Sequence, residues 1–236
     1  MQDTSGTAVT DGAADDFFSP AATESMNIAL SLNHDADKLA QFYDKWAAYY
    51  DEDVSEEFML PTMMLNALKE AIAKDEAGLS WAGNAEALVM DAGCGTGAVG
   101  KVYADAGYKN IDGCDISNEM VEKARATGAY RDLKGAYDLN KPVTDAYAAA
   151  YDVVTIAGVF TVGHVPPESL RNVAAMVRPG GLLVASTRMA YYERTNYQEV
   201  SDAMEKEGAL KLVHKLSDAP YTMDSTAHYW VYQVAS

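Results

Sequence analysis

The sequence has little positive charge. It contains 18 Lys and Arg against 35 Asp and Glu, and its formal net charge is −17 at pH 7. A chain this acidic repels nucleic-acid phosphates and anionic membrane surfaces, so we predict neither as a partner. We interpret the charge as an aid to solubility, with a cationic substrate as the alternative that it would also favour.

Cysteine and long apolar runs are also scarce. The two cysteines, Cys94 and Cys114, are predicted to be reduced and packed as small side chains, and no His and Cys cluster has zinc spacing, so no metal site is expected. No run approaches the roughly 18 apolar residues of a membrane helix, and the first residues lack the basic and apolar segments of a signal peptide. These absences predict a cytoplasmic protein without membrane contact.

The composition changes near residue 35. Residues 1–34 contain no Lys or Arg and little apolar surface, which predicts a largely flexible acidic leader. The rest of the chain is long enough to bury one core, and we expect residues 35–236 to form one domain. Its first part, residues 35–77, has helical patterns and is predicted to form an N-terminal helical lid.

A glycine-rich turn organises this domain. The apolar run 88–92 is predicted to form a buried strand, and it leads into Gly93-Cys94-Gly95-Thr96-Gly97. Open α/β sheets use such a turn to bring backbone close to a nucleotide. Residues 95–100 satisfy the G-x-G-x-x-G fingerprint of dinucleotide sites, and Asp115 lies 18 residues after Gly97 in its acidic position. Asp91 would repel a pyrophosphate, however, and favours a ligand with a positive group.

Strand and helix patterns alternate beyond this turn, which indicates a parallel sheet covered on both faces. The remaining strands are predicted at 111–116, within 130–139, and at 152–157, 182–187, 210–216 and 228–234. Helices are predicted near 39–50, 61–74, 97–106, from 117, from 166 to a Pro-Gly stop at 178–181, and at 197–207, with 78–83 as a loop.

Several motifs resemble the class I methyltransferases that use S-adenosylmethionine. Residues 91–97 resemble their first motif, and residues 43–51 resemble the Tyr-Asp-x-x-Ala-x-x-Tyr-Asp segment that precedes it. Between about residues 40 and 190, the Asp-Gly-Cys-Asp-Ile-Ser turn and the Gly-His-Val-Pro-Pro segment resemble the Williams-Beuren-region methyltransferase-like proteins. The resemblance and the closing hairpin imply an α/β, Rossmann-like, seven-stranded and mostly parallel sheet of order 3-2-1-4-5-7-6, with the last strand antiparallel and helices on both faces.

The resemblance also implies an S-adenosylmethionine site. The cradle would comprise Asp91, Gly93, Cys94, Gly95 and Gly97, with Ala157 and Gly158 beside it at the fourth strand end. Asp115 can accept hydrogen bonds from the ribose hydroxyls, although a helix cap is its alternative role. Ile116 and Met120 would enclose the adenine, and Asp138 with Leu139 would contact its edge, with Asp132 as a competing acid.

Aromatic residues recur at helical spacing before the cradle. Tyr43, Trp46 and Tyr50 share one face of the predicted first helix. Because aromatic faces attract cations, we hypothesise that they form a lid over the sulfonium of the methyl donor. The alternative is ordinary packing of this face on the domain.

The acceptor site is expected where the later strands end. Its candidate residues are Tyr49, Phe160, His164, Arg188, Tyr191, Tyr192 and His228. His164 is the candidate general base, or alternatively a histidine that orders the Pro-Pro turn. The arginine and tyrosines that follow the fifth strand could recognise a carboxylate on the acceptor, since Arg binds carboxylates through a bidentate fork; ordinary ion pairing is the alternative.

These observations predict an S-adenosylmethionine-dependent methyltransferase. It would move a methyl group to a small-molecule acceptor by in-line displacement, a reaction that depends on positioning and exclusion of water. The alternatives are a non-catalytic protein that binds S-adenosylmethionine or S-adenosylhomocysteine, and an NAD-dependent oxidoreductase. The sequence indicates neither the acceptor atom nor the oligomeric state.

Overall fold

The computed structural model describes residue 28 and residues 31–32, 34–53, 58–74, 78–143 and 146–235. The predicted leader, residues 1–34, lies almost wholly outside these ranges. So do residues 54–57 and 75–77 of the predicted lid.

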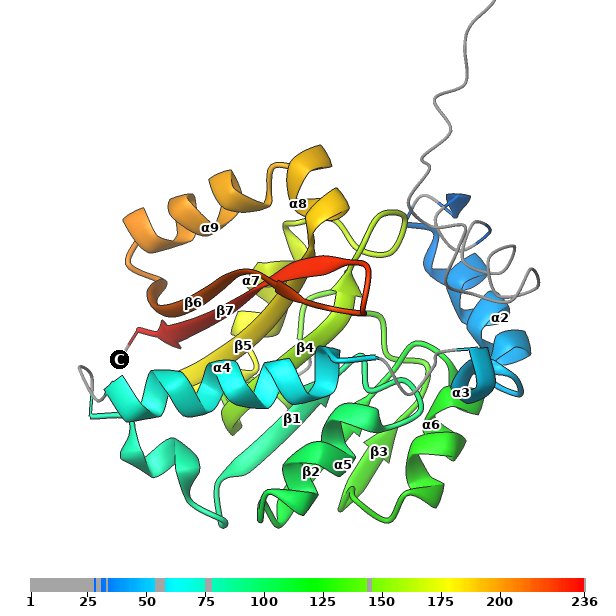
Figure 1. Cartoon of the computed structure of the whole chain (residues 1–236), viewed down its shortest axis with the longest axis horizontal. Coiled ribbons are helices and arrows are strands. Elements are labelled where there is room, and N and C mark those ends of the chain that lie inside the picture. The colour runs from blue at the N-terminus through cyan, green and yellow to red at the C-terminus, as the bar shows by residue number, and fades with distance from the viewer. Residues whose placement is uncertain are drawn as a thin grey trace, which may run out of the picture.

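A seven-stranded sheet forms the centre of the molecule (Figure 1). Its strands in chain order are β1 (Leu88–Ala92), β2 (Asn110–Cys114), β3 (Asp132–Lys134), β4 (Tyr151–Phe160), β5 (Val177–Arg188), β6 (Leu210–Pro220) and β7 (Thr226–Val234). They lie in the order β3-β2-β1-β4-β5-β7-β6. Neighbours from β3 to β5 are parallel, and β7 is antiparallel to β5 and to β6. The predicted order and the antiparallel last strand are confirmed.

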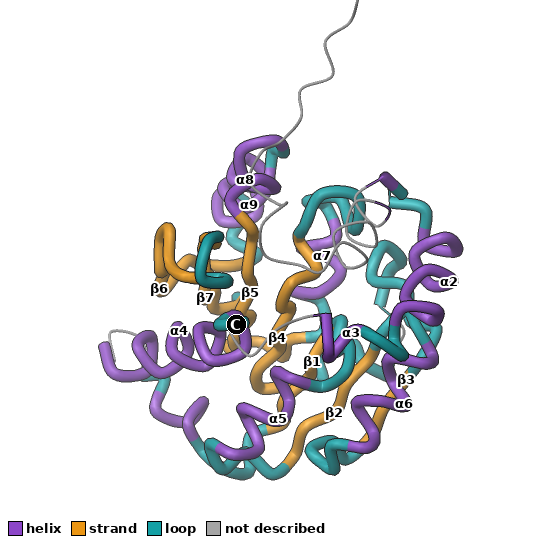
Figure 2. Tube along the Cα trace, turned by 45° about the vertical axis from the view of Figure 1, so that its right-hand side comes forward, coloured by secondary structure: helices purple, strands orange, loops and turns teal. Residues whose placement is uncertain are grey.

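Helices cover both faces of the sheet, as predicted (Figures 1 and 2). One face is covered by α4 (Leu60–Lys74), the 3-10 turn η1 (Ser80–Gly83) and α5 (Ala98–Asp105). The opposite face is covered by α7 (Ser169–Ala174), α8 (Met189–Arg194) and α9 (Tyr197–Lys206). Two further helices, α2 (Ala36–Trp46) and α6 (Asn118–Ala126), pack against each other beside the β3 edge, and the short α3 (Tyr50–Asp53) follows α2.

The central strands are apolar on both sides because both sides are buried. In β1, Val89 packs into the core under α4 while its neighbour Met90 packs into the core under α7 and α9. In β4, Val153 likewise packs into the core under α4, and Val154 packs into the core under α7 and α9. Continuous runs of β-branched and aliphatic residues are typical of buried parallel strands, and here they create two cores on one sheet.

Three local expectations need correction. Residues 80–83 form the η1 turn rather than a loop. Helix α7 ends at Ala174, and the Arg178-Pro179-Gly180-Gly181 segment lies inside β5, where the register with β4 shifts. A Pro-Gly pair therefore marks a strand irregularity here rather than a helix stop. The single helix predicted near 39–50 is divided, because α2 ends at Trp46 and α3 begins at Tyr50.

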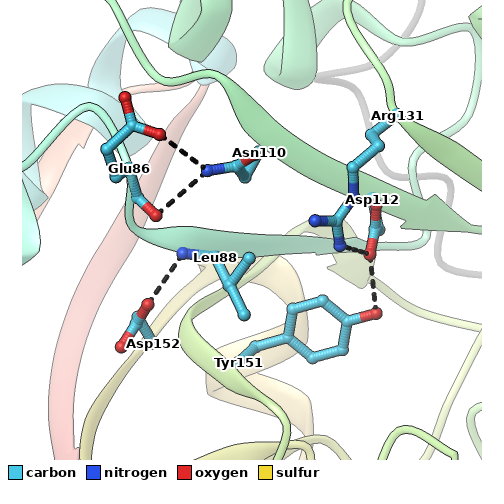
Figure 3. A network of polar contacts seen from close by, with 7 residues as sticks. All are labelled: Glu86, Leu88, Asn110, Asp112, Arg131, Tyr151 and Asp152. Atoms are coloured by element: carbon cyan, nitrogen blue, oxygen red, sulfur yellow. Dashed lines mark hydrogen bonds and ion pairs between the residues drawn. The ribbon is translucent and has the colours of Figure 1, made fainter.

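Charged pairs surround the starts of β1 and β4 (Figure 3). Asp152 accepts the backbone N–H of Leu88 at 2.7 Å and pairs with Arg178 at 2.6 Å. Asp112 accepts two bonds from Arg131, at 3.0 and 2.7 Å, and one from the hydroxyl of Tyr151 at 3.1 Å. These acids stabilise the sheet at the end away from the glycine-rich turn.

No helix within the described ranges is long and apolar enough to cross a membrane.

Candidate functional site

A cavity lies at the carboxyl ends of the central strands. It holds about 990 Å³ of empty space, part of which is open to solvent. Its walls come from the turn after β1, the loops after β2, β3 and β4, and helix α2. The predicted site residues that line it are Tyr43, Tyr50, Gly93, Cys94, Gly95, Asp115, Ile116, Met120, Asp138, Leu139, Ala157, Gly158 and His164.

The glycine-rich turn forms one wall, and its glycines adopt a backbone conformation that other residues rarely adopt. Gly93, Gly95 and Gly97 have φ values of 79°, 53° and 95°, in the left-handed region. A Cβ on Gly93 would approach the side chain of Val159 to 2.3 Å. Gly97 does not line the cavity; it precedes α5 and packs against the backbone of Ala124. The turn therefore exposes backbone to the cavity, as a nucleotide cradle requires.

Asp115 lies directly after β2 and is nearly buried. Its carboxylate accepts the backbone N–H of Gly95 at 2.8 Å and that of Ser117 at 2.9 Å. Burial raises the pKa of this carboxyl group, and the two backbone bonds oppose that shift. Ser117, not Asp115, caps α6 by accepting the Met120 N–H at 3.1 Å. A carboxylate has about four acceptor positions, so Asp115 keeps capacity for the two hydroxyls of a ribose.

Asp91 does not line the cavity, which differs from its predicted place in the cradle. One carboxylate oxygen accepts the hydroxyl of Tyr130 at 2.7 Å and the other accepts that of Thr155 at 3.0 Å. Burial raises the pKa of Asp91 to about 6. Asp91 therefore holds Tyr130 and Thr155 in place beneath the turn. Its charge can attract a positive group of a ligand only electrostatically, without direct contact.

Tyr130 explains two glycines that the motif analysis left without a role. Its ring fills the space beside Gly100 and Gly113, where an added Cβ would come within 2.2 and 2.9 Å of it. Its hydroxyl also accepts the N–H of Gly100 at 3.2 Å. Gly100 of the fingerprint and Gly113 of β2 thus leave space for a tyrosine that holds Asp91, a role that no local pattern around residue 130 indicates.

The loop after β3 supplies the second predicted acid. Asp138 and Leu139 line the cavity, whereas the competing Asp132 lies exposed in β3. Asp138 accepts the N–H of Asn140 at 2.9 Å and lies 3.4 Å from the ammonium of Lys141. This placement favours Asp138 over Asp132 as the acid that would contact the edge of a bound base. Such a base would lie between the apolar side chains of Ile116 and Met120.

Helices α2 and α3 bring aromatic rings to another wall. Tyr43 and Tyr50 line the cavity, while Trp46 is buried behind them, stacks on Tyr43 at 5.8 Å and donates its indole N–H to Asp53 at 2.8 Å. Asp44 accepts the hydroxyl of Ser117 at 2.6 Å, which ties α2 to the start of α6. Trp46 thus packs behind Tyr43 and does not line the cavity.

His164 faces the cavity as a neutral base. Its Nδ1 donates to the carbonyl of Val162 at 3.1 Å, and its Nε2 accepts the hydroxyl of Tyr43 at 2.5 Å. Burial lowers the pKa of His164 to about 4 and raises that of Tyr43 well above its ordinary value. The pair joins helix α2 to the loop after β4, with both side chains at the cavity wall.

Most other predicted acceptor residues lie away from the cavity wall. Phe160 and Tyr191 are fully buried in the core, where Tyr191 donates to the carbonyl of Val165 at 2.9 Å. Tyr192 packs on His228 at 4.5 Å, and His228 accepts the N–H of Asp218 at 2.9 Å. Tyr49 is 63% exposed. These aromatic residues stabilise the α8 and β7 region or face solvent.

Arg188 lies against Tyr221 at the side of the cavity. Its guanidinium carbon is 5.1 Å from the ring centre of Tyr221, and that ring lines the cavity beside Gly158. The sequence analysis missed Tyr221, Phe58 and Leu60 as wall residues. Tyr221 lies in the connection between β6 and β7, where no helix or strand periodicity marks it in the sequence. Only the order of the strands in the sheet brings it near the carboxyl end of β4.

Both cysteines are free and buried, as predicted, and burial raises the pKa of each thiol.

Comparisons with known proteins agree with this geometry. Residues 90–183 match the family described as methyltransferase domain. The chain is 31% identical over 159 residues to human Methyltransferase-like protein 27, covering 66% of this chain and 61% of that protein. It is 32% identical over 162 residues to the Ubiquinone biosynthesis O-methyltransferase of Bordetella avium (strain 197N), covering 66% and 63%. The matched regions span less than two thirds of either relative.

The fold is also similar to a solved structure. Magnesium protoporphyrin IX methyltransferase from Synechocystis PCC 6803, crystallised with S-adenosylhomocysteine, superposes with a TM-score of 0.57 at 16% identity over 85% of this chain and 100% of that chain. The glycine cradle and the free acceptor positions of Asp115 fit an adenosyl group. Residues 90–183 are therefore similar to a methyltransferase domain, and the fold of the chain is similar to that of the solved methyltransferase.

Proposed function

We propose that the protein transfers a methyl group from S-adenosylmethionine to a small-molecule acceptor. The observation that carries this proposal is Asp115, a nearly buried carboxylate with unused acceptor positions in a cavity whose adjoining wall is bare glycine backbone. The similarity to a ubiquinone biosynthesis O-methyltransferase supports an acceptor of small-molecule size. The net charge of −17 disfavours nucleic acid as the acceptor.

The residues of the cavity divide between holding the donor and positioning the acceptor. Bound S-adenosylmethionine supplies a methyl group that is already activated on a sulfonium. Asp115 would hold the ribose, Ile116 and Met120 would pack on the adenine, and Asp138 would accept from the base edge. The lid rings of Tyr43 and Tyr50 would exclude water and present their negative faces to a cation.

His164 can act on a proton of the acceptor. Its Nε2 lone pair is held by the hydroxyl of Tyr43, so an acceptor hydroxyl must displace that bond or pass its proton through the phenol. Because His164 is neutral, it can take up a proton without first losing one. Its environment disfavours a lasting imidazolium, so the proton would leave again to solvent.

The test combines binding and turnover. We expect calorimetry to show binding of S-adenosylmethionine and S-adenosylhomocysteine and none of NADH. Asp115→Asn should weaken S-adenosylhomocysteine binding about 30- to 100-fold, because one acceptor position becomes a donor that faces existing donors. Asp132→Asn, which changes an exposed acid on β3, is the matched control and should bind as the wild type does.

Turnover is measured with methyl-labelled donor and a metabolite extract, with products identified by mass spectrometry. A labelled small molecule supports the proposal. Donor binding without any labelled product would indicate a non-catalytic S-adenosylmethionine-binding protein, and tight NADH binding without binding of the sulfonium compound would indicate an oxidoreductase. The cytoplasmic location stays a prediction, tested by fractionation of the native host.

A further inference from the structure

The arginines of this chain have different surroundings. In a chain with 35 acidic residues, an arginine readily finds a carboxylate. Ion pairs within the described residues join a carboxylate to each of Arg125, Arg131, Arg171 and Arg178. No such pair forms at Arg188 among the residues that the structure describes.

Arg188 is held in place although no carboxylate among the described residues pairs with it. It is the last residue of β5, is half-buried, and lies with its guanidinium over the face of Tyr221 at 5.1 Å. Tyr221 is 8% exposed and packs edge-on against Phe58 at 5.3 Å, so the platform under the cation is rigid. A planar cation on an aromatic face keeps its N–H edge available for another partner.

The charge of Arg188 reaches the cavity. Burial raises the pKa of Tyr221, Tyr43 and Tyr50, and the positive charge of Arg188 opposes that rise at each of them. It also adds to the burial that lowers the pKa of His164. All four side chains line the cavity, so the arginine acts on the part bounded by the lid and the β4 end.

This part of the cavity lies beside the adenosyl cradle. Its wall contains Gly158, whose position for a Cβ lies 3.3 Å from both the Tyr221 hydroxyl and the Leu60 side chain. Phenols, one neutral imidazole and apolar side chains make up the surface near Arg188, with Asp115 on the cradle side. An acceptor here would meet one fixed positive charge and several neutral hydrogen-bonding groups.

We propose that the methyl acceptor is a small carboxylate-bearing molecule whose anion is bound by Arg188 beside Tyr221. The inference rests on the proposed methyltransferase function and names its substrate class. The guanidinium of Arg188 can donate two parallel N–H···O bonds to a carboxylate, and these bonds would orient the acceptor as well as attract it. The acidity of the rest of the chain makes this local cation necessary for an anionic substrate, since the summed field repels anions.

The test uses the full chain with saturating S-adenosylhomocysteine for binding and S-adenosylmethionine for turnover. The probes are small hydroxy-, amino- and thiol-bearing carboxylic acids, each compared with its primary amide and with the corresponding amine. We expect acids to bind and react, and Arg188→Gln to lower kcat/KM for them about 10- to 100-fold, mainly through KM. Arg188→Lys keeps the charge without the fork and should restore part of the loss.

Arg171→Gln is the matched control, because it removes an arginine from an exposed pair with Glu207 and should leave the KM for acids unchanged. Equal use of acids and amides, preference for amines, failure of every acid to bind, or an Arg188→Gln enzyme with wild-type KM would overturn the proposal. Failure of S-adenosylhomocysteine to bind would instead remove the proposed function, so the two failures are distinguishable.

Discussion

Two aspartates close together in the chain, one within strand β2 and one directly after it, have different partners. Asp112, inside the strand, accepts bonds from Arg131 and from Tyr151 (Figure 3). Asp115, just after the strand, accepts two backbone N–H groups and lines the cavity. Both are nearly buried, so exposure does not separate the acid that holds the fold from the acid that is available to a ligand. Their partners do.

The same difference holds between the two ends of the sheet. Around the starts of the strands, Asp112 and Asp152 each have an arginine within 2.7 Å. Around the carboxyl ends, Asp115 has backbone partners, His164 is neutral, and Arg188 lies on an aromatic ring. Charge that is paired inside the protein contributes to stability, and charge held in place without an opposite charge is available for binding.

Asp112→Ala should give the largest effect on stability. Removing the buried carboxylate leaves the Tyr151 hydroxyl and the Arg131 guanidinium without their partner. We expect a loss of about 3 kcal/mol in the free energy of unfolding, at the low end for a broken buried pair because Arg131 is 50% exposed. Urea denaturation measures it, and S-adenosylhomocysteine affinity of the folded variant should be that of the wild type.

Glu86→Ala is the control in the same network. Glu86 pairs with Lys109, and both side chains are more than 60% exposed. Its removal should change stability by at most about 0.5 kcal/mol. A loss of ligand affinity in Asp112→Ala comparable to that of Asp115→Asn would break the distinction between the two ends of the sheet.

The lowered pKa of His164, which lies near the carboxyl ends of the strands, predicts that the free energy of unfolding depends on pH. This pKa is about 4 in the folded protein and its ordinary value is 6.5, so below pH 6.5 the unfolded chain binds a proton that the folded protein does not. The stabilising contribution is therefore present above pH 6.5 and is lost as the pH falls. Between pH 7 and pH 5 the loss is about 2 kcal/mol.

The measurement compares wild type with His164→Gln by urea denaturation at pH 7, 6 and 5. The comparison removes the opposite contribution of Asp91, whose raised pKa favours the folded protein as the pH falls toward 4. We expect the stability difference between the two proteins to change by about 2 kcal/mol across this range, in the direction that penalises the wild type at low pH. A constant difference would mean that His164 titrates normally.

The sheet order was predictable from the resemblance to class I methyltransferases and from the closing hairpin, once the alternation of strand and helix patterns indicated a parallel sheet. The turn residues and Asp115 were predictable because the glycine spacing and the strand end are local features. Tyr221, Tyr130 and the pairing state of Arg188 were not, because each depends on contacts between segments far apart in the chain. Thr155 carried a weak signal, as a hydroxyl within the apolar run of β4.

Tyr43→Phe should give a smaller effect that separates the two components of the lid. The substitution removes the hydroxyl that donates to Nε2 of His164 but keeps the ring that stacks on Trp46. A buried ring nitrogen without its donor costs about 1 kcal/mol, so we expect a loss of that size and faster hydrogen exchange in α2. Tyr49→Phe, at a side chain that is 63% exposed, is the control and should leave the free energy of unfolding unchanged. If Tyr43→Phe also leaves stability and exchange unchanged, then ring stacking and the Asp44–Ser117 bond are enough to hold α2 in place. The hydroxyl of Tyr43 would then, like Arg188, be available to the acceptor because the fold does not depend on it.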